Sequence, residues 1–167
     1  MQSVEPTGRV IVQGHGVRGR QRWGPADAEP GTKPEISVLA QRRYRCVQCK
    51  AVVLVRPRGE LAHRRYTAAA IVLALWLWSC ELHSDAAVRS RTSPWPTRGM
   101  SRPERWPTLR RWAKAAGIGA LWSCARGDAG WTMRRCAERA ARVIEALADV
   151  AIGPPQHRVF AGVVHAR

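Results

Sequence analysis

Two cysteines separated by two residues, Cys46 and Cys49, form the sharpest chemical motif of the chain. A Cys-x-x-Cys turn places two thiolates side by side, with backbone amides directed at the sulfur atoms, and so supplies half of a tetrahedral zinc site. A structural zinc site needs four ligands, and the second pair is missing. We therefore interpret Cys46 and Cys49 as a half site and expect no cofactor, with bound zinc as the open alternative.

The charge of the chain indicates a polyanionic partner. The 167 residues include 28 Lys+Arg against 12 Asp+Glu, which gives a formal net charge of +16, and only three of the cations are lysines. Excess cation favours nucleic acid because binding releases counterions from the phosphate backbone, and arginine grips phosphate or guanine through two hydrogen bonds. We expect double-stranded DNA as the partner. A coding bias towards Arg and Ala, without selection for nucleic acid, explains the same composition.

A helix near the middle of the chain is the predicted DNA-contacting element. Apolar residues recur at the i, i+3, i+4 and i+7 positions within residues 106–116, which predicts a helix with one buried face. In a helix-turn-helix core the last helix enters the major groove, and its outward N-terminal residues meet base edges. A helical bundle with a solvated basic face is the alternative. The candidate DNA-binding residues on this helix and on the loop before it are Thr108, Arg110, Arg111, Lys114, Arg98, Arg102 and Arg105.

Turn residues and alternation define the elements before this helix. Dense Gly and Pro predict that residues 1–35 are mostly loop, with a short strand at Val10–Gln13. Alternating apolar residues from Ile36 and a β-branched run at residues 51–55 predict two antiparallel strands joined at the Cys-x-x-Cys turn. We expect a loop-rich segment at 1–35, a hairpin at 36–60, a helix-turn-helix-like helical domain at 61–116 and a C-terminal helix with a flexible tail at 117–167.

Helical signals dominate the rest of the chain, so the predicted fold class is α+β and mainly α. Residues 66–78 are apolar all round, which marks a buried helix, and Thr67 is its expected N-cap. A short helix is expected from Asp85 to about Arg91, capped by Ser84. A further helix is predicted over about residues 132–149, and the tail to Arg167 is expected to be frayed.

The tryptophans divide into two groups. Trp76, Trp78 and Trp112 fall on buried helix faces, which favours core packing. The others lie near loops or helix ends, where a ring can stack on a nucleic-acid base. This second group consists of Trp23, Trp95, Trp106, Trp122 and Trp131.

The order of these segments resembles a bacterial group of proteins. Four segments in this order resemble proteins with an N-terminal zinc ribbon followed by a homeodomain-like helix-turn-helix. They are Val12-Gln13-Gly14-His15, Arg42-Arg43-Tyr44-Arg45-Cys46-x-x-Cys49, residues 64–71 and Leu109-Arg110-Arg111-Trp112. This group is related to insertion-sequence transposases, and the resemblance covers residues 10–116. It implies that the hairpin is a degenerate zinc ribbon. Such ribbons carry an earlier Cys-x-x-Cys just before the segment matching residues 12–15, so we expect a misplaced start or a truncated copy.

Several classes of function are disfavoured. The longest uncharged run, Tyr66 to Cys80, is shorter than the roughly 20 residues needed to cross a bilayer, so we expect no membrane partner and a cytoplasmic location. We find no paired carboxylates, phosphate loop or dinucleotide fingerprint, so we expect neither an enzyme nor a small-molecule substrate. The sequence predicts a small basic DNA-binding protein, transposase-related, without its own catalytic domain. A non-functional truncated remnant, or an RNA- or protein-binding ribbon adaptor, remains the alternative.

Overall fold

The computed structural model describes residues 10–25, 30–95 and 105–166. Its residues fall into two units, Met1–Arg20 with Val38–Pro57 and Gln21–Ser37 with Arg58–Arg167. We call the first the sheet unit and the second the helical unit, and both terms refer below to the described residues only. Within these residues the structure has a three-stranded antiparallel sheet and five α-helices, with 41% helix and 20% strand, so the predicted α+β class is confirmed.

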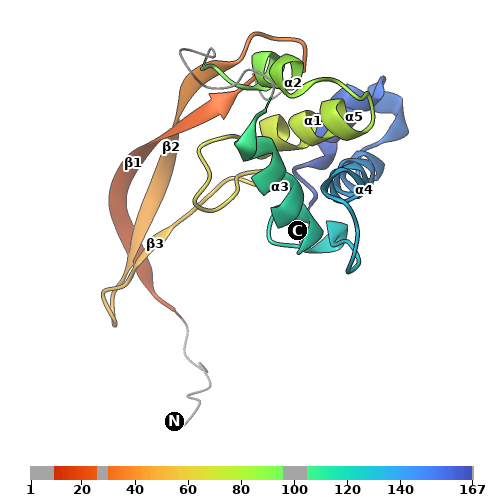
Figure 1. Ribbon diagram of the computed structural model, residues 1–167. Helices are drawn as coiled ribbons and strands as arrows, with labels where there is room; N and C mark the ends of the chain where they lie inside the picture. Colours follow the sequence, from red (N-terminus) through yellow and green to blue (C-terminus); the bar gives the residue numbers. More distant parts are fainter. Residues whose placement is uncertain (1–9, 26–29, 96–104, 167) are drawn as a thin grey trace. The chain divides into compact units, whose positions relative to one another are not determined.

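The sheet has the order β1 (Val12–Gly24), β2 (Glu35–Cys46) and β3 (Val52–Leu54) (Figure 1). Strands β2 and β3 are antiparallel, and their register pairs Arg43 with Leu54 and Arg45 with Val52. The Cys46 amide donates a hydrogen bond to the Ala51 carbonyl at 2.9 Å, which closes the turn between them. The predicted pair of antiparallel strands around the Cys-x-x-Cys turn is therefore confirmed.

Strand β1 differs from the sequence prediction, because a 13-residue strand occupies much of the segment expected to be loop. The glycines that suggested turns are accommodated within the pairing of the strand. Gly16 has φ +84°, a left-handed conformation that glycine adopts at no steric cost. A Cβ at Gly19 would lie only 3.3 Å from Val38 Cγ1, so Gly19 allows β2 to approach closely. Residues 1–9 and 26–29 of the same segment lie outside the described residues.

Helix α1 (Ala68–Ser79) is the centre of the helical unit, and every one of its residues is buried. Its first turn is capped as predicted, since the Thr67 hydroxyl accepts a hydrogen bond from the Ala70 amide at 3.0 Å. It packs against α2 (Asp85–Thr92), α3 (Pro107–Gly117), α4 (Met133–Ala146) and α5 (Pro155–Gly162) (Figure 1). Four helices and the chain at Gly24 lie against it, which explains why its sequence is apolar around the whole circumference.

The amphipathic helices follow the predicted stripes. Leu109, Trp112, Ala113 and Ala116 of α3 are buried, and α4 buries its stripe from Cys136 to Ile144. Ser84 and Thr132 cap α2 and α4 through their side chains. Helix α4 ends at Ala146, a few residues before the predicted end, and a 3₁₀ turn follows at Val150–Ile152.

The C-terminal segment contradicts the prediction of a frayed tail. Helix α5 begins at Pro155, a residue suited to the first helical position, and buries Val159 and Phe160 against the core. Gly162 lies so close to α4 that a Cβ there would be 1.8 Å from the Ile144 carbonyl oxygen. Helix α5 lacks the side-chain N-cap that marks the equally short α2, and its tertiary contact with α4 stabilises it instead.

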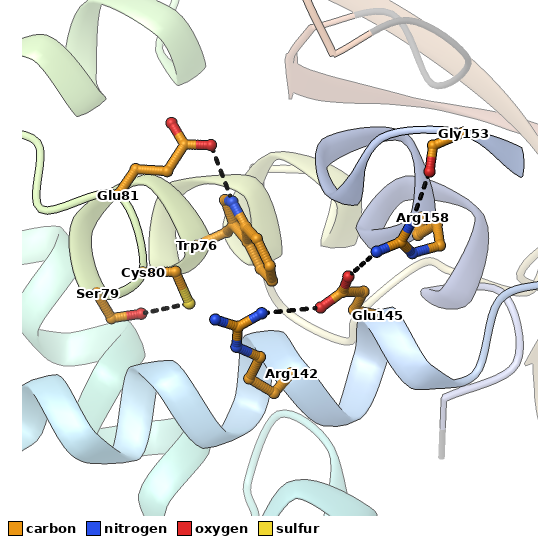
Figure 2. Close-up of polar contacts among 8 residues, drawn as sticks. All are labelled: Trp76, Ser79, Cys80, Glu81, Arg142, Glu145, Gly153 and Arg158. Atoms are coloured by element: carbon orange, nitrogen blue, oxygen red, sulfur yellow. Dashed lines mark hydrogen bonds and ion pairs between the residues drawn. The ribbon is translucent and has the colours of Figure 1, made fainter. Parts of the chain in front are cut away.

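A polar network joins the end of α1 to α4 and α5 (Figure 2). Trp76 Nε1 donates to a Glu81 carboxylate oxygen at 3.0 Å, and Gln156 of α5 donates to the same oxygen at 2.8 Å. Burial opposes ionisation of Glu81, but the hydrogen bonds from Gln156, Trp76 and His83 outweigh it and lower the pKa of this carboxyl group.

The second half of this network is an arginine–glutamate cluster. Arg142 pairs with Glu145 at 3.4 Å, and Arg158 donates both to Glu145 and to the Gly153 carbonyl (Figure 2). The Arg142 guanidinium also lies 4.7 Å from the centre of the Trp76 ring. Arginines of the helical unit thus contribute to its own packing.

Candidate nucleic-acid interface

Arg110, the central residue of the predicted DNA-contacting helix, is engaged within the helical unit. Its guanidinium forms an ion pair with the buried carboxylate of Asp85, and it lies 5.7 Å from the centre of the Trp78 ring. The same Asp85 oxygen accepts a hydrogen bond from the Trp106 amide at 2.6 Å. Asp85 therefore connects the start of α2 to the start of α3. The sequence predicted that Arg110 points outward towards DNA, whereas the structure pairs it with Asp85.

The other predicted residues of α3 form a short outer stripe. Arg111 and Lys114 are exposed and Thr108 is half-buried, and their spacing of three residues places them on one side of the helix. Arg105, just before the helix, is exposed as well. Arg98 and Arg102 lie outside the described residues. The structure thus brings together Thr108, Arg111 and Lys114, whereas Arg110 turns towards Asp85.

Helix α4 carries further exposed arginines, and several of them contact neighbouring groups of the helical unit. The guanidiniums of Arg134 and Arg135 lie 4.9 Å and 4.4 Å from the ring centres of Trp78 and Trp131. Arg139 Nε donates to the Arg126 carbonyl at 3.0 Å. Such cation–π and hydrogen-bond contacts hold arginine side chains along the protein surface.

The sheet unit has a different charge balance. Its described residues, 10–20 and 38–57, contain no Asp or Glu. Its cations are Arg18, Arg20, Arg42, Arg43, Arg45, Lys50 and Arg56. Most of its side chains are exposed or half-buried, because no helix of this unit covers the sheet. The unit therefore presents a cationic surface that no carboxylate of its own described residues neutralises.

Strand alternation sorts these cations onto faces of the sheet. The proximity of Gly19 to Val38 places these two residues on one face, so the exposed Arg18 and the half-buried Arg43 lie on the other. Arg45 shares the face of Arg43, two residues away on the same strand. We call the face that carries Arg18, Arg43 and Arg45 the arginine face.

The opposite face of the sheet carries the exposed Arg42 together with apolar side chains. It carries Val38 and, because Tyr44 pairs with Val53, also Val53. The side chains of Val38 and Val53 are 68% and 49% exposed. The arginine face also carries Val52 and Leu54, which pair with Arg45 and Arg43, so the two faces differ in their number of arginines.

The Cys-x-x-Cys turn has the local geometry expected of a thiolate pair. Cys46 is buried and Cys49 exposed, and both are free thiols. Hydrogen bonds from the backbone amides of Cys49 and Gln48 lower the pKa of the Cys46 thiol, with a smaller contribution from the Lys50 charge. Within the described residues, no three His, Cys, Asp or Glu side chains gather into a group able to hold a metal ion. Cys46 and Cys49 would supply two of the four ligands of a zinc ion.

Sequence analysis did not select Arg18, Arg43 and Arg45 as site residues, although it placed Arg43 and Arg45 on a strand. The signal that identifies them is the i, i+2 spacing of two arginines within a segment free of Asp and Glu. The loop prediction for residues 1–35 concealed Arg18, because alternation is informative only where a strand is assigned.

No protein-family model matches the chain, and the comparisons with curated proteins and with solved structures found no significant match. In the part of the chain that the structure covers, no helix combines the length and apolar character needed to cross a membrane.

Proposed function

We propose that this chain is a DNA-binding protein whose principal contact surface is the arginine face of the sheet. The observation that carries the proposal is the composition of the sheet unit, whose described residues include seven cations and no Asp or Glu. Each cation placed against a phosphate releases counterions, so an excess of positive charge of this size favours a polyanion.

The shape of the sheet supports double-stranded DNA as the ligand. Strand β3 has three residues and pairs with β2 at Arg43–Arg45, so the sheet is three-stranded there and a two-stranded ribbon over the rest of its length. The major groove of B-DNA is wide enough for a two-stranded β-ribbon, and arginine reads guanine there through two hydrogen bonds. The predicted relation to insertion-sequence transposases belongs to this proposal, in which the role of the chain is to bind DNA.

The test compares two double variants with equal loss of charge. Arg43→Ala with Arg45→Ala alters the arginine face, and Arg111→Ala with Lys114→Ala alters the outer stripe of α3. Binding to a fluorescent duplex of about 20 base pairs is measured by anisotropy across a salt series. We expect the sheet variant to lose at least roughly tenfold in affinity and to flatten the slope of log K against log salt by about 2.

The control variant on α3 is expected to lose less affinity, because the helical unit also carries carboxylates, such as Asp85 beside Arg110, which weaken its attraction for phosphate. Circular dichroism checks that both variants remain folded. Equal binding of the wild type and the sheet variant across the salt series would refute the arginine face as the contact surface. Preference for a structured RNA over the duplex at matched salt would replace DNA by RNA as the ligand.

A further inference from the structure

Trp95 differs from the other tryptophans in its exposure. Trp76, Trp78, Trp106, Trp112 and Trp122 are at most 6% exposed, which assigns Trp106 and Trp122 to the core rather than to base stacking. Trp23 and Trp131 are half-buried, and each has an arginine guanidinium over its ring. Trp95 is 46% exposed. A partly exposed tryptophan offers a partner both an apolar ring and a polar N–H, which is why tryptophan is enriched at interfaces.

Contacts with Trp23 and Ser93 hold Trp95 in place. Its ring meets the Trp23 ring edge to face, with the ring centres 5.6 Å apart and the planes at 75°. Trp23 in turn contacts Tyr66, which contacts the buried Trp112. The Trp95 amide donates to Ser93 Oγ at 3.3 Å, and Ser93 Oγ is 2.8 Å from the Tyr66 hydroxyl. These contacts join Trp95 to the core of the helical unit.

The ring also has a surface available for a ligand. An edge-to-face contact uses at most one face of a ring, so the contact with Trp23 leaves at least one face of Trp95 for another partner. Because the ring is already fixed, a ligand that stacks on it loses little additional side-chain entropy. An exposed arginine lies one ring away, since the Arg65 guanidinium is 5.1 Å from the centre of the Trp23 ring.

From this arrangement we infer that Trp95 stacks on an unpaired base of a single-stranded DNA segment, while Arg65 attracts its phosphate. Every base has a π-face, so such a platform binds single strands with little sequence preference. The inference rests on the proposed function in taking nucleic acid as the ligand. It adds a second class of target, because bases stacked inside a duplex do not offer a face to Trp95.

The experiment compares two single-stranded probes of equal length and charge, an oligothymidylate of about ten nucleotides and an abasic backbone of the same length. We expect the wild-type protein to bind the oligothymidylate more tightly, with quenching of tryptophan fluorescence. Trp95→Ala should remove this preference, a loss of roughly tenfold for the oligothymidylate, and leave the abasic probe unaffected. Trp95→Phe, which keeps an aromatic ring, should retain part of the preference.

Trp131→Ala is the matched control, since it removes a half-buried tryptophan elsewhere in the helical unit and should leave the preference unchanged. The inference is overturned if wild-type protein binds both probes equally, or if Trp95→Ala keeps the preference. In either case salt-dependent duplex binding through Arg43 and Arg45 would still support the proposed function. If the wild-type protein does not bind the duplex but prefers the oligothymidylate to the abasic probe through Trp95, only the proposed function is contradicted.

Discussion

Several arginines of the helical unit rest on tryptophan rings or pair with carboxylates, whereas the described residues of the sheet unit include no Asp or Glu. Arg110 and Arg134 both lie over Trp78, and Arg158 pairs with Glu145. Arg43 and Arg45 are half-buried side chains of the sheet unit, whose described residues carry no Asp or Glu. The same residue type therefore stabilises one unit and charges the other. Net charge alone does not identify an interface, since the carboxylates and rings near each cation decide its role.

A difference in core accompanies the difference in charge. Helix α1 is buried along its whole length, while the valines of the sheet are largely exposed. Burial of apolar side chains is the main source of folding free energy, so the helical unit should have most of the stability of the chain. The predictions below test this contrast.

The largest effect is expected from Leu109, which is fully buried in α3. Leu109→Ala should lower the free energy of unfolding by about 2–5 kcal/mol, because it removes apolar contacts and leaves a cavity. Val53→Ala, at a position 49% exposed on the sheet, should cost less than about 1 kcal/mol. Urea unfolding followed by circular dichroism measures both. Similar losses in the two variants would contradict the contrast in core.

The next largest difference in the free energy of unfolding is expected between alanine substitutions at Gly162 in the helical unit and at Gly14 in the sheet unit. Gly162→Ala would drive a methyl group into the Ile144 carbonyl, and this clash should outweigh the gain of about 1 kcal/mol in helix propensity. We expect a net loss of about 1–3 kcal/mol. Gly14→Ala has no atom within 4 Å of the new methyl group and should change stability by no more than about 0.5 kcal/mol. Thermal unfolding of the two variants makes the comparison, and an unchanged Gly162→Ala would show that α5 detaches easily.

Asp85 tests whether the arginines of the helical unit are structural. Asp85→Ala leaves the Trp106 amide and Arg110 without their shared acceptor, and should cost about 2 kcal/mol. Asp85→Asn keeps a neutral acceptor and should lose less. Urea unfolding measures both variants. If Asp85→Ala matches the wild type, Arg110 is not held structurally, and its predicted role on DNA regains support.

The smallest effect concerns acid stability. The pKa of Glu81 lies below its usual value of 4.5, so its ionised form favours the folded state above that pH, and this contribution is lost as the pH falls through the lowered pKa. Glu81→Gln should therefore cost up to about 1 kcal/mol near neutral pH and progressively less in acid, since the group is partly exposed. Unfolding measured across pH tests this, and a pH-independent difference would exclude ionisation of Glu81 as the cause. The described residues of the sheet unit have no carboxyl group to contribute a comparable term.

Local signals in the sequence were sufficient for the helices with complete periods and caps. Thr67, Ser84 and Thr132 mark the starts of α1, α2 and α4, because side-chain capping depends on residues within one turn. The antiparallel strands on either side of the Cys-x-x-Cys turn were predicted for a similar reason, since alternation and a turn motif are both local.

The features that sequence analysis missed depend on tertiary contacts. The glycines of β1 predicted turns, whereas in the structure the strand pairs with β2 and Gly19 lies against Val38. Helix α5 depends on its contact with α4. The pairing of Arg110 with Asp85 joins residues 25 positions apart, so periodicity within α3 gave no sign of it. The partners of an arginine are not encoded in its neighbours along the chain. For this reason the sequence predicted a site on α3, whereas the proposed contact surface lies on the sheet.

Lys50 closes the turn that carries the two cysteines, and its backbone has φ +62°, a conformation that costs a residue with a Cβ roughly 1 kcal/mol or more. Its ammonium reaches back to the Val47 carbonyl at 2.6 Å. A glycine at position 50 would relieve the backbone strain, but it would remove both this hydrogen bond and the positive charge beside the sulfur atoms. The tip of the hairpin thus accepts backbone strain and keeps a cation next to its most reactive atoms.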